Sequence, residues 1–101
     1  MIDYLDFSGV DEADIRRERH KARLLRQSAW WRRKIGPGLC HYCGQRHQPQ
    51  ELTMEHLGPL GRGGKSVKGN LDPACKDCNN KKKTMLPLEW DEYMGTIARE
   101  R

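Results

Sequence analysis

The sequence predicts a small α+β fold that depends on a bound metal ion for part of its stability, and three observations support this prediction. The chain has 101 residues, only 36% of them hydrophobic, so one domain with a small core is expected. A long stretch without Gly or Pro is typical of a helix, and a glycine-rich loop follows a short extended segment. Two Cys-x-x-Cys pairs supply four possible metal ligands, which would compensate for the small core.

The N-terminal part of the chain is predicted to form one long basic helix over residues 11–34, which contain neither Gly nor Pro. Ser8 followed by Asp11 is typical of a helix start, with a capping hydroxyl and then acids in the first turn. Gly36-Pro37-Gly38 then ends the helix. One face is expected to pack on the core through apolar residues spaced seven, three and four apart: Ile15, Ala22, Leu25 and Ala29.

The middle of the chain is predicted to contain a β-hairpin followed by a loop. Residues 39–56 contain short extended segments, among them Leu52-Thr53-Met54. Residues 57–70 hold five of the ten glycines. This density indicates a loop whose backbone adopts positive φ or approaches another segment closely.

Two further helices are predicted after the loop. Pro73 suits the first turn of a helix that runs through Asn79 to about Lys83. Pro87 suits the start of a last helix, one face of which carries apolar residues at helical spacing: Trp90, Met94 and Ile97. The predicted order is therefore helix, hairpin, loop, helix, helix.

The chain shows no internal repeat and no clear linker, so residues 1–101 are expected to form one domain. Its parts are an N-terminal helical extension over 1–38, a core over 39–84 and a C-terminal helix over 85–101. No apolar run approaches the roughly 20 residues of a membrane-spanning helix. Residues 1–15 are acidic and lack the apolar stretch of a secretory signal, so we expect a cytoplasmic protein.

The net charge of +5 is concentrated in two basic blocks. Residues 16–34 contain nine basic residues and one acid, and residues 62–83 contain seven basic residues and two acids. Blocks of this density are typical of surfaces that bind nucleic acid or another polyanion. A solvated helix face without any partner has the same pattern, so charge alone leaves both interpretations open.

Four cysteines form two Cys-x-x-Cys pairs, Cys40/Cys43 and Cys75/Cys78, with 31 residues between them. In a cytoplasmic protein such pairs are typical of metal ligands rather than disulfides. Two pairs fill the four positions of a tetrahedral zinc ion, and Gly44 suits the tight turn after the first pair. A redox-active pair would need a βαβ context, which the sequence lacks. Four thiolates close the coordination sphere, so we expect a structural Zn²⁺.

Several short motifs follow one another between and after the cysteine pairs. The acid–histidine pair Glu55-His56 begins a His-x-x-Pro-Leu-x-x-Gly-Gly loop, Asn70-Leu71 follows, and the second cysteine pair continues as Cys-x-x-Cys-Asn-x-x-Lys. In this order and at this spacing, residues 40 to about 83 resemble the HNH endonuclease family, in its branch with two Cys-x-x-Cys pairs. The resemblance implies a ββα-metal fold, in which a hairpin packs on a helix and one catalytic metal lies between them.

The resemblance also implies a role for each matching residue. His56 is the general base, and Asn70 braces the loop and orients His56. Glu55 and Asn79 are ligands of the catalytic metal. Family members more often have Asp at position 55, and many have His at position 79. With Asn at that position the ligands are oxygen atoms, which favours Mg²⁺ or Mn²⁺ as the second cofactor. The products are expected to carry 5′-phosphate and 3′-hydroxyl ends.

These residue types suit phosphodiester hydrolysis on chemical grounds as well. A neutral imidazole takes a proton from water near neutral pH, and a divalent ion stabilises the phosphate and the departing 3′ oxygen. One active site per chain predicts that a monomer nicks DNA, and a chain this short predicts little sequence specificity. Five basic residues are expected to contact the backbone of duplex DNA: Arg62, Lys65 and Lys82 in the second basic block, and Arg32 and Arg33 in the basic helix.

Two other classes of protein share parts of this pattern. A zinc-containing DNA-binding module, or a degenerate nuclease, would keep the cysteines and the basic residues but has no need of Glu55-His56. A structural or assembly protein would use the basic helix to bind an acidic partner and would not bind DNA even at low salt. The acid–histidine pair beside a glycine loop favours the nuclease.

Overall fold

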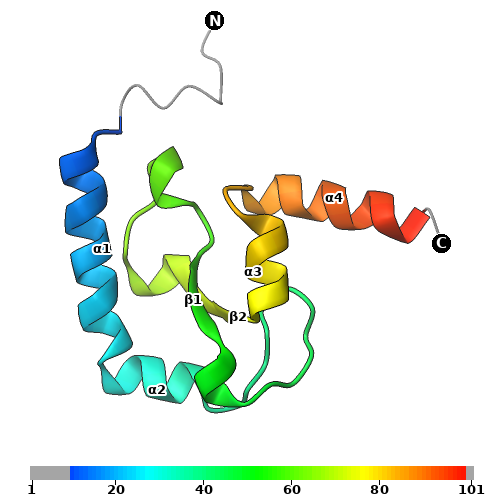
Figure 1. Cartoon of the computed structure of the whole chain (residues 1–101), viewed down its shortest axis with the longest axis horizontal. Helices are drawn as coiled ribbons and strands as arrows, with labels where there is room; N and C mark the ends of the chain where they lie inside the picture. Colours follow the sequence, from blue (N-terminus) through cyan, green and yellow to red (C-terminus); the bar gives the residue numbers. More distant parts are fainter. Residues whose placement is uncertain (1–9, 100–101) are drawn as a thin grey trace, which may run out of the picture.

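The computed structural model describes residues 10–99, with side chains as far as residue 96. Helix α1 (Glu12–Arg26) and helix α2 (Ala29–Ile35) precede a two-stranded sheet of β1 (Thr53–His56) and β2 (Leu71–Ala74), and α3 (Lys76–Lys82) and α4 (Pro87–Arg99) follow it. Three single-turn helices lie in the connections: η1 (Pro49–Glu51), η2 (Leu60–Arg62) and η3 (Lys68–Asn70). The predicted small α+β fold, with a hairpin followed by a helix, is confirmed (Figure 1).

The predicted single helix over residues 11–34 is wrong in one respect, because the structure divides it into α1 and α2. Ser28 causes the division. Its Oγ accepts a hydrogen bond from the Trp31 N–H at 3.3 Å, which caps α2, and donates one to the Leu25 carbonyl. Serine competes with the helix for backbone hydrogen bonds in this way and favours a cap over a helix interior.

Helix α1 begins at Asp11, whose side chain accepts a hydrogen bond from the Asp14 N–H at 2.8 Å. Ser8, the other residue expected at the start, lies outside the described residues. Ala22 is buried on the face expected to pack inward, and Ile15 and Leu25 are half-buried there. Ala29 is exposed, since it belongs to α2 and no longer continues that face.

The two strands pair antiparallel, with Glu55 opposite Asp72 and His56 opposite Leu71. The hairpin was expected within residues 39–56, but its second strand comes after the glycine-rich loop. Pro73 was expected to begin a helix and instead lies in β2, where an edge strand tolerates its missing N–H. Helix α3 begins later because Cys75 is its N-cap and accepts a hydrogen bond from the Cys78 N–H.

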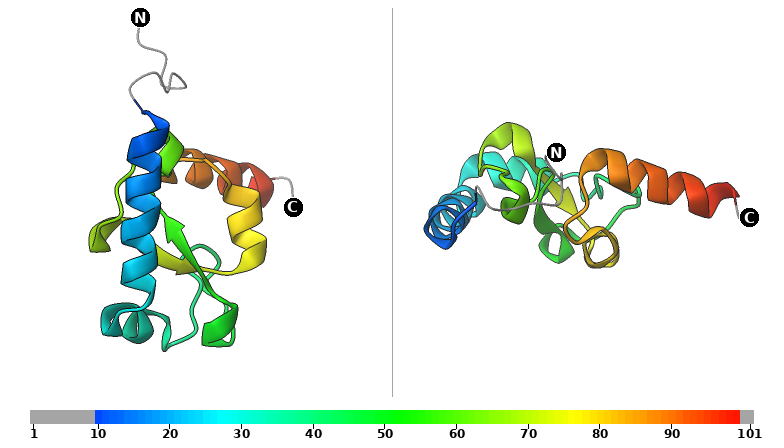
Figure 2. Two further views of the ribbon diagram at one scale, coloured as in Figure 1. Left: turned by 60° about the vertical axis from the view of Figure 1, so that its left-hand side comes forward. Right: turned by 90° about the horizontal axis from the view of Figure 1, so that it is seen from above.

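Successive side chains of a strand point to opposite faces of the sheet. Thr53 and Glu55 therefore share the face that contacts α3, and Met54 and His56 lie on the other face. Helices α1 and α3 lie on opposite sides of the hairpin (Figure 1; Figure 2 gives two further views). The two faces of the hairpin therefore carry different side chains, with Glu55 on the face toward α3 and His56 on the face away from it.

The glycine-rich loop over residues 57–70 follows the expectation at two positions. Gly63 has φ +86°, in the left-handed region. A Cβ on Gly64 would lie 1.7 Å from the Gly58 carbonyl oxygen, so only glycine fits this close approach. The loop folds back on itself and brings its later residues beside the end of β1.

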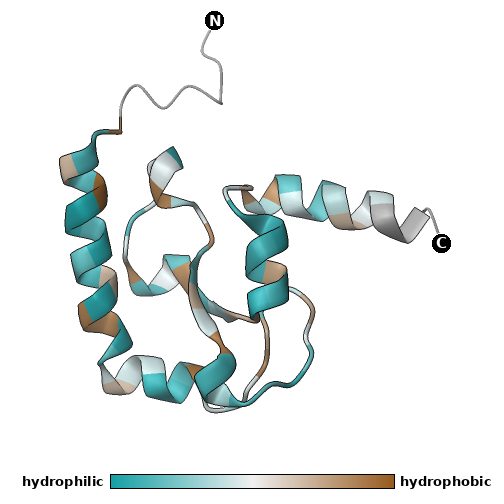
Figure 3. Ribbon diagram, in the orientation of Figure 1, coloured by the Kyte–Doolittle hydropathy of each residue, from teal (hydrophilic) through white to brown (hydrophobic). Residues whose placement is uncertain are grey.

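The core is small, and hydrophobic residues are thinly scattered over the ribbon in Figure 3. Trp90 of α4 packs on Tyr42 with ring centroids 5.0 Å apart, and Trp31 of α2 is also buried. The Ile97 side chain, expected on the same face as Trp90, lies outside the described side chains. The main cluster joins Trp90 to residues around the cysteines: Cys40, Leu52, Ala74, Cys75 and Cys78.

Candidate active site and metal centre

The four cysteines come together at one end of the sheet. Their Sγ atoms all lie within 4.8 Å of one another, with Cys43 exposed and the other three buried. Zn–S bonds of about 2.3 Å in a tetrahedron place the sulfur atoms about 3.8 Å apart, so this cluster fits one zinc ion. The first pair lies in a knuckle in which Gly44, at φ +70°, donates its N–H to the Cys40 carbonyl at 3.0 Å.

The surroundings of the cluster act differently on its thiols, since burial raises the pKa of Cys43 and Cys78 whereas the pKa of Cys40 is lowered. Burial raises the pKa of the Cys40 thiol, but backbone N–H groups outweigh it and lower that pKa to about 7. Ligand thiols must lose their protons to bind a metal, so hydrogen bonds of this kind assist binding. The predicted four-cysteine cluster is therefore confirmed, and it is suited to a structural zinc.

His56 is the last residue of β1, and its half-buried side chain points away from α3. Its Nε2 lies 2.9 Å from the Ser66 Oγ, in the returning part of the glycine-rich loop. Burial lowers the pKa of His56, and Arg26 and Lys82 lower it further against the opposing charge of Glu18. A pKa below the usual value near 6.5 keeps the imidazole neutral at neutral pH, as a proton acceptor requires.

Ser66 connects His56 to α1. The Ser66 N–H donates to the Glu18 carboxylate at 2.6 Å, and its hydroxyl donates to the Glu18 backbone carbonyl. Glu18 is only 6% exposed, which is unusual for a carboxylate, and the Ser66 N–H holds its pKa below the ordinary value against the opposing effect of burial. Neither Ser66 nor Glu18 was predicted as a site residue.

Asn70 closes the loop that carries Ser66. Its Oδ1 accepts the Gly58 N–H at 2.7 Å, and its Nδ2 donates to the carbonyls of Gly58 at 3.1 Å and Lys65 at 2.8 Å. Three hydrogen bonds from one amide fix both ends of the loop, two residues after His56 and one residue before Ser66. Asn70 thus makes the loop contacts that its expected bracing role requires, and it does so through backbone groups.

Glu55 lies on the other face of β1 and is 6% exposed. Its Oε1 is 3.6 Å from the Lys82 ammonium of α3, which is completely buried. Burial raises the pKa of the Glu55 carboxyl and lowers that of the Lys82 ammonium, while each charge opposes the shift of the other. Lys82 also donates to the Leu57 carbonyl at 3.3 Å and the Met85 carbonyl at 2.6 Å, so it ties α3 to the residue that follows His56.

Asn79 lies on α3, three residues before Lys82, and faces Thr53 of β1. Its Nδ2 donates to the Thr53 Oγ1 at 3.1 Å, and that hydroxyl donates to the Ala74 carbonyl at 3.0 Å. Because the hydroxyl has one hydrogen, it accepts from Asn79, and this fixes which side of the amide faces Thr53. The Asn79 Oδ1 is left as an oxygen donor for a cation.

The structure therefore divides the predicted site between the two sides of the hairpin. Glu55 and Asn79 belong to the side of α3, with one carboxylate and one amide oxygen that suit a hard divalent cation. His56 belongs to the side of α1 and the loop. The two parts of the site are connected at the end of β1, because Lys82 of α3 donates a hydrogen bond to the carbonyl of Leu57, the residue after His56.

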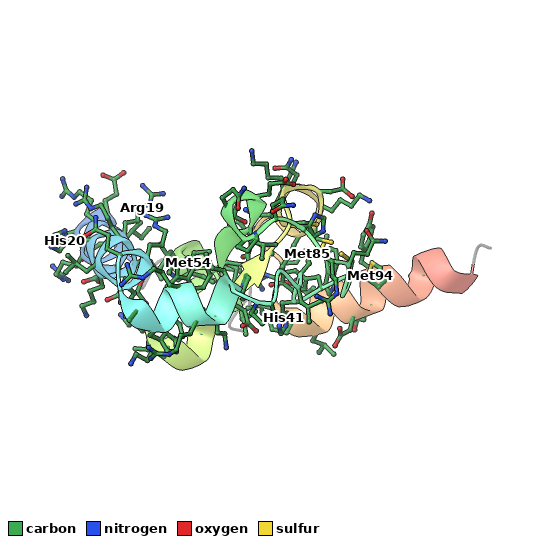
Figure 4. The ribbon with its side chains drawn as sticks, turned by 90° about the horizontal axis from the view of Figure 1, so that it is seen from below. Arg19, His20, His41, Met54, Met85 and Met94 are labelled. Carbon is green, nitrogen blue, oxygen red and sulfur yellow. The ribbon has the colours of Figure 1, made fainter. Side chains whose placement is uncertain are left out.

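A further acid was missed beside Glu55. Asp72 lies directly opposite Glu55 in the sheet and pairs with His41, at 2.5 Å from Nδ1, and with Lys34, at 3.0 Å from Nζ. His41, labelled in Figure 4, belongs to the cysteine knuckle, and Lys34 belongs to α2. No sequence signal identified this cluster, because the second strand was expected elsewhere and the cross-strand register was unknown.

The five basic residues that are expected to contact the DNA backbone differ in their exposure to solvent. Lys65, Arg32 and Arg33 are exposed. The Lys82 ammonium has no exposed surface, and the Arg62 side chain is 6% exposed and pairs with Glu89 of α4. Lys82 and Arg62 therefore make internal contacts in this structure, which differs from the surface contacts expected for them.

The fold and site define a class of protein in which a hairpin and a helix present an acid–histidine pair beside a four-cysteine centre. A comparison with protein-family models matches residues 40–92, just over half of the chain, to the model described as HNH endonuclease. The chain belongs to the HNH endonuclease family, as its motifs predicted. Family membership suggests a nuclease, which implies a phosphodiester hydrolase with a nucleic-acid substrate.

A search of curated proteins found no significant match to the chain. Among residues 10–99, no helix is both long enough and apolar enough to cross a membrane.

Proposed function

We propose that this protein is a metal-dependent DNA endonuclease with His56 as its general base. The observation that carries the proposal is the position of His56. It is a half-buried imidazole at the end of β1, held by the loop that Asn70 braces, and it directly follows the acid that faces α3. A DNA-binding module without catalysis has no use for a histidine that is fixed in this way.

The proposed role of His56 is to take the proton from the water that attacks the scissile phosphate. Its lowered pKa leaves the imidazole neutral near pH 7, so the group is ready to accept that proton. Asn70 performs no acid–base chemistry, since an amide does not titrate, and it acts by holding the loop against the end of β1.

Glu55 and Asn79 are the residues that would hold the catalytic divalent ion, Mg²⁺ or Mn²⁺. Both offer oxygen atoms, which fits hard cations, and Thr53 leaves the Asn79 Oδ1 free. When bound, such an ion supplies positive charge to the phosphate and to the departing 3′ oxygen. Burial raises the pKa of the Glu55 carboxyl, and the Lys82 ammonium opposes this effect and so favours the ionised form that a cation requires.

The proposed DNA-binding surface includes α1 as well as Lys65, Arg32 and Arg33. Exposed arginines spaced three, four and three residues apart form a row along one face of α1, which lines a groove of about 230 Å³: Arg16, Arg19, Arg23 and Arg26. Among residues 10–99, no ion pair occupies any of the four. Arg19 lies beside His20 on α1 (Figure 4). Such a row suits the phosphate backbone of a duplex without reading its sequence.

One site per chain hydrolyses one strand, so the proposed product is a nicked duplex with 5′-phosphate and 3′-hydroxyl ends. The four-cysteine zinc takes no part in the reaction, since four thiolates leave no open position. Its role is to hold the knuckle and the start of α3 together, and thereby to position Asn79.

A supercoiled-plasmid assay tests the proposal. The purified protein is incubated with plasmid and each of Mg²⁺, Mn²⁺, Ca²⁺ and Zn²⁺, and the nicked form is measured. We expect nicking with Mg²⁺ or Mn²⁺, complete inhibition by EDTA, and nicks that DNA ligase reseals without end treatment. DNA retention on a gel without nicking under any metal condition would favour the DNA-binding module instead.

A further inference from the structure

Glu18 is a charged residue buried on α1, on the same face as the apolar Ala22. Burial of a carboxylate is costly unless hydrogen bonds compensate for it. Here the side chain accepts from the Ser66 N–H at 2.6 Å and pairs with Lys21 at 3.2 Å. The contact links two residues that are 48 positions apart in the sequence. Ser66 directly follows Lys65, whose carbonyl accepts a hydrogen bond from Asn70 in the same loop.

The direction of each hydrogen bond around Ser66 follows from simple chemistry. The Glu18 backbone carbonyl has no hydrogen, so the Ser66 hydroxyl must be the donor in the bond between them. That hydroxyl has only one hydrogen. Its oxygen is therefore the acceptor for the His56 Nε2, 2.9 Å away, and Nε2 is the protonated nitrogen of a neutral imidazole.

We infer that Glu18, acting through Ser66, positions the His56 imidazole and fixes its tautomer. Two hydrogen bonds clamp Ser66 to α1, and a third passes from His56 to Ser66. Nδ1 then keeps the free lone pair, and among residues 10–99 no hydrogen bond engages it. The inference rests on the proposed function, in which that lone pair accepts the proton from water.

The clamp matters because a general base must be aimed as well as neutral. A histidine at a strand end has two rotatable bonds and two tautomers, and a misplacement of about 1 Å costs about 100-fold in rate. Hydrogen-bond partners that orient metal-ligating histidines have effects of about 10- to 100-fold when they are removed, and we expect an effect of similar size for a histidine base. Ser66 and Glu18 are therefore positioning residues, and the N-terminal helix belongs to the active site.

Nitrogen-15 NMR of the histidine side chains tests the tautomer without any activity measurement. The His56→Ala variant identifies the His56 signals. We expect wild-type His56 with a proton on Nε2 and none on Nδ1, and a mixture of tautomers in Ser66→Ala. A proton on Nδ1 in the wild type would overturn the inference, whether or not the protein cuts DNA.

Kinetics test the positioning role. We expect Ser66→Ala to lower kcat for nicking by about 10- to 100-fold with little change in KM, and Ser66→Thr, which keeps a hydroxyl, to restore most of it. Glu18→Ala is expected to lower kcat to a smaller extent, because the Glu18 carbonyl still accepts from Ser66. Glu12→Ala, an exposed acid on the same helix, should leave kcat unchanged.

A second control separates positioning from a general loss of stability. Ser28→Ala removes the cap of α2 and has no contact with His56, so it should lower the melting temperature without lowering kcat at 25 °C. An active wild type with an unchanged rate in Ser66→Ala would overturn the inference alone. A wild type that never nicks DNA would contradict the proposed function, and the NMR measurement would then decide separately whether Ser66 fixes the His56 tautomer.

Discussion

The buried pair of Lys82 and Glu55 combines a stabilising role with a place in the site. A lysine with no exposed surface is rare, and this one is compensated by Glu55 and two backbone carbonyls. These contacts give the lysine one helical turn after Asn79 a specific buried role. Its three partners lie at fixed positions that a surface lysine would not satisfy.

Replacing Lys82 by methionine should therefore be strongly destabilising. The variant would leave the Glu55 carboxylate buried without its partner, at a cost of about 3–5 kcal/mol in the free energy of unfolding. Urea denaturation of the zinc-loaded protein measures this loss. Lys81→Met is the matched control, since Lys81 is exposed and pairs with the exposed Asp77, and it should change stability little. Equal effects of the two substitutions would contradict the buried role of Lys82.

Glu18 gives the stability of the protein a predictable dependence on pH. Its pKa is lowered from 4.5 by the Ser66 N–H, so the folded state binds the proton less well than the unfolded state. The contribution of Glu18 is therefore fully present above about pH 4.5 and is lost as pH falls through the folded-state pKa. Glu18→Gln should be less stable than wild type at pH 7, and the difference should shrink as pH falls below 4.5 and through the lower folded-state pKa. A difference in urea midpoint that stays constant with pH would contradict this prediction.

At the scale of elements, the cysteine knuckle and α3 depend on one another. Cys75 is at once the N-cap of α3 and a member of the four-sulfur cluster, so loss of the metal affects both. Asn79 and Lys82 follow on the same short helix. A zinc ion bound by the cluster would therefore help to position both residues against β1.

Removing the metal should unfold the core. The energy of zinc binding in small domains, about 10–16 kcal/mol, exceeds the stability of most domains of this size. We expect the circular dichroism of α3 and the hairpin to be lost in a strong thiolate-competing chelator and in Cys75→Ser. His47→Ala, a change outside the cluster, serves as the control and should keep zinc content at one ion per chain. A folded Cys75→Ser variant without zinc would contradict the role of the metal.

Elements with strong local signals could be predicted from the sequence, whereas those set by distant contacts could not. The spacing of the cysteines predicted the four-cysteine cluster, because two Cys-x-x-Cys pairs at this spacing are typical of a metal site. The second strand was missed, since Leu71-Asp72-Pro73-Ala74 contains a proline and no clear alternation. The division of the first helix was missed because Ser28 interrupts it without a glycine or proline.

The same difference holds within the candidate site. Glu55, His56, Asn70 and Asn79 were found through short motifs, each of which has a local order in the sequence. Ser66 and Glu18 have no such motif, and their contact spans 48 residues. A single sequence gives no information on which residue of α1 meets the loop, so only the folded structure identified this connection.

At the scale of the whole molecule, the proposed DNA-binding face of α1 and the proposed metal ligands near α3 lie apart in a thin structure. The principal-axis extents are 42 × 41 × 18 Å, and α1 and α3 lie on opposite sides of the hairpin (Figure 1). The arginine row lies on α1, and Arg26 at its end influences the pKa of His56. DNA bound along α1 would therefore lead toward the end of β1.

The arginine row predicts a specific salt dependence of DNA binding. Each phosphate contact that is lost reduces the slope of log K against log salt by about 0.9. Arg19→Ala/Arg23→Ala should therefore reduce the slope by roughly 1.8, measured by fluorescence anisotropy with a labelled duplex. Arg17→Ala/Lys76→Ala removes the same charge away from the row and should change the slope little. Equal slopes for the two double variants would contradict the assignment of the row.

The most direct test of the central claim is the single-turnover rate of plasmid nicking by His56→Ala and wild type, at equal zinc content and with Mg²⁺ or Mn²⁺ supplied. We predict that the variant loses nicking by at least about 100-fold, because a positioned general base contributes that much to the rate. Its affinity for the same plasmid should match that of the wild type. Nicking by His56→Ala at the wild-type rate would contradict the assignment of His56 as the general base.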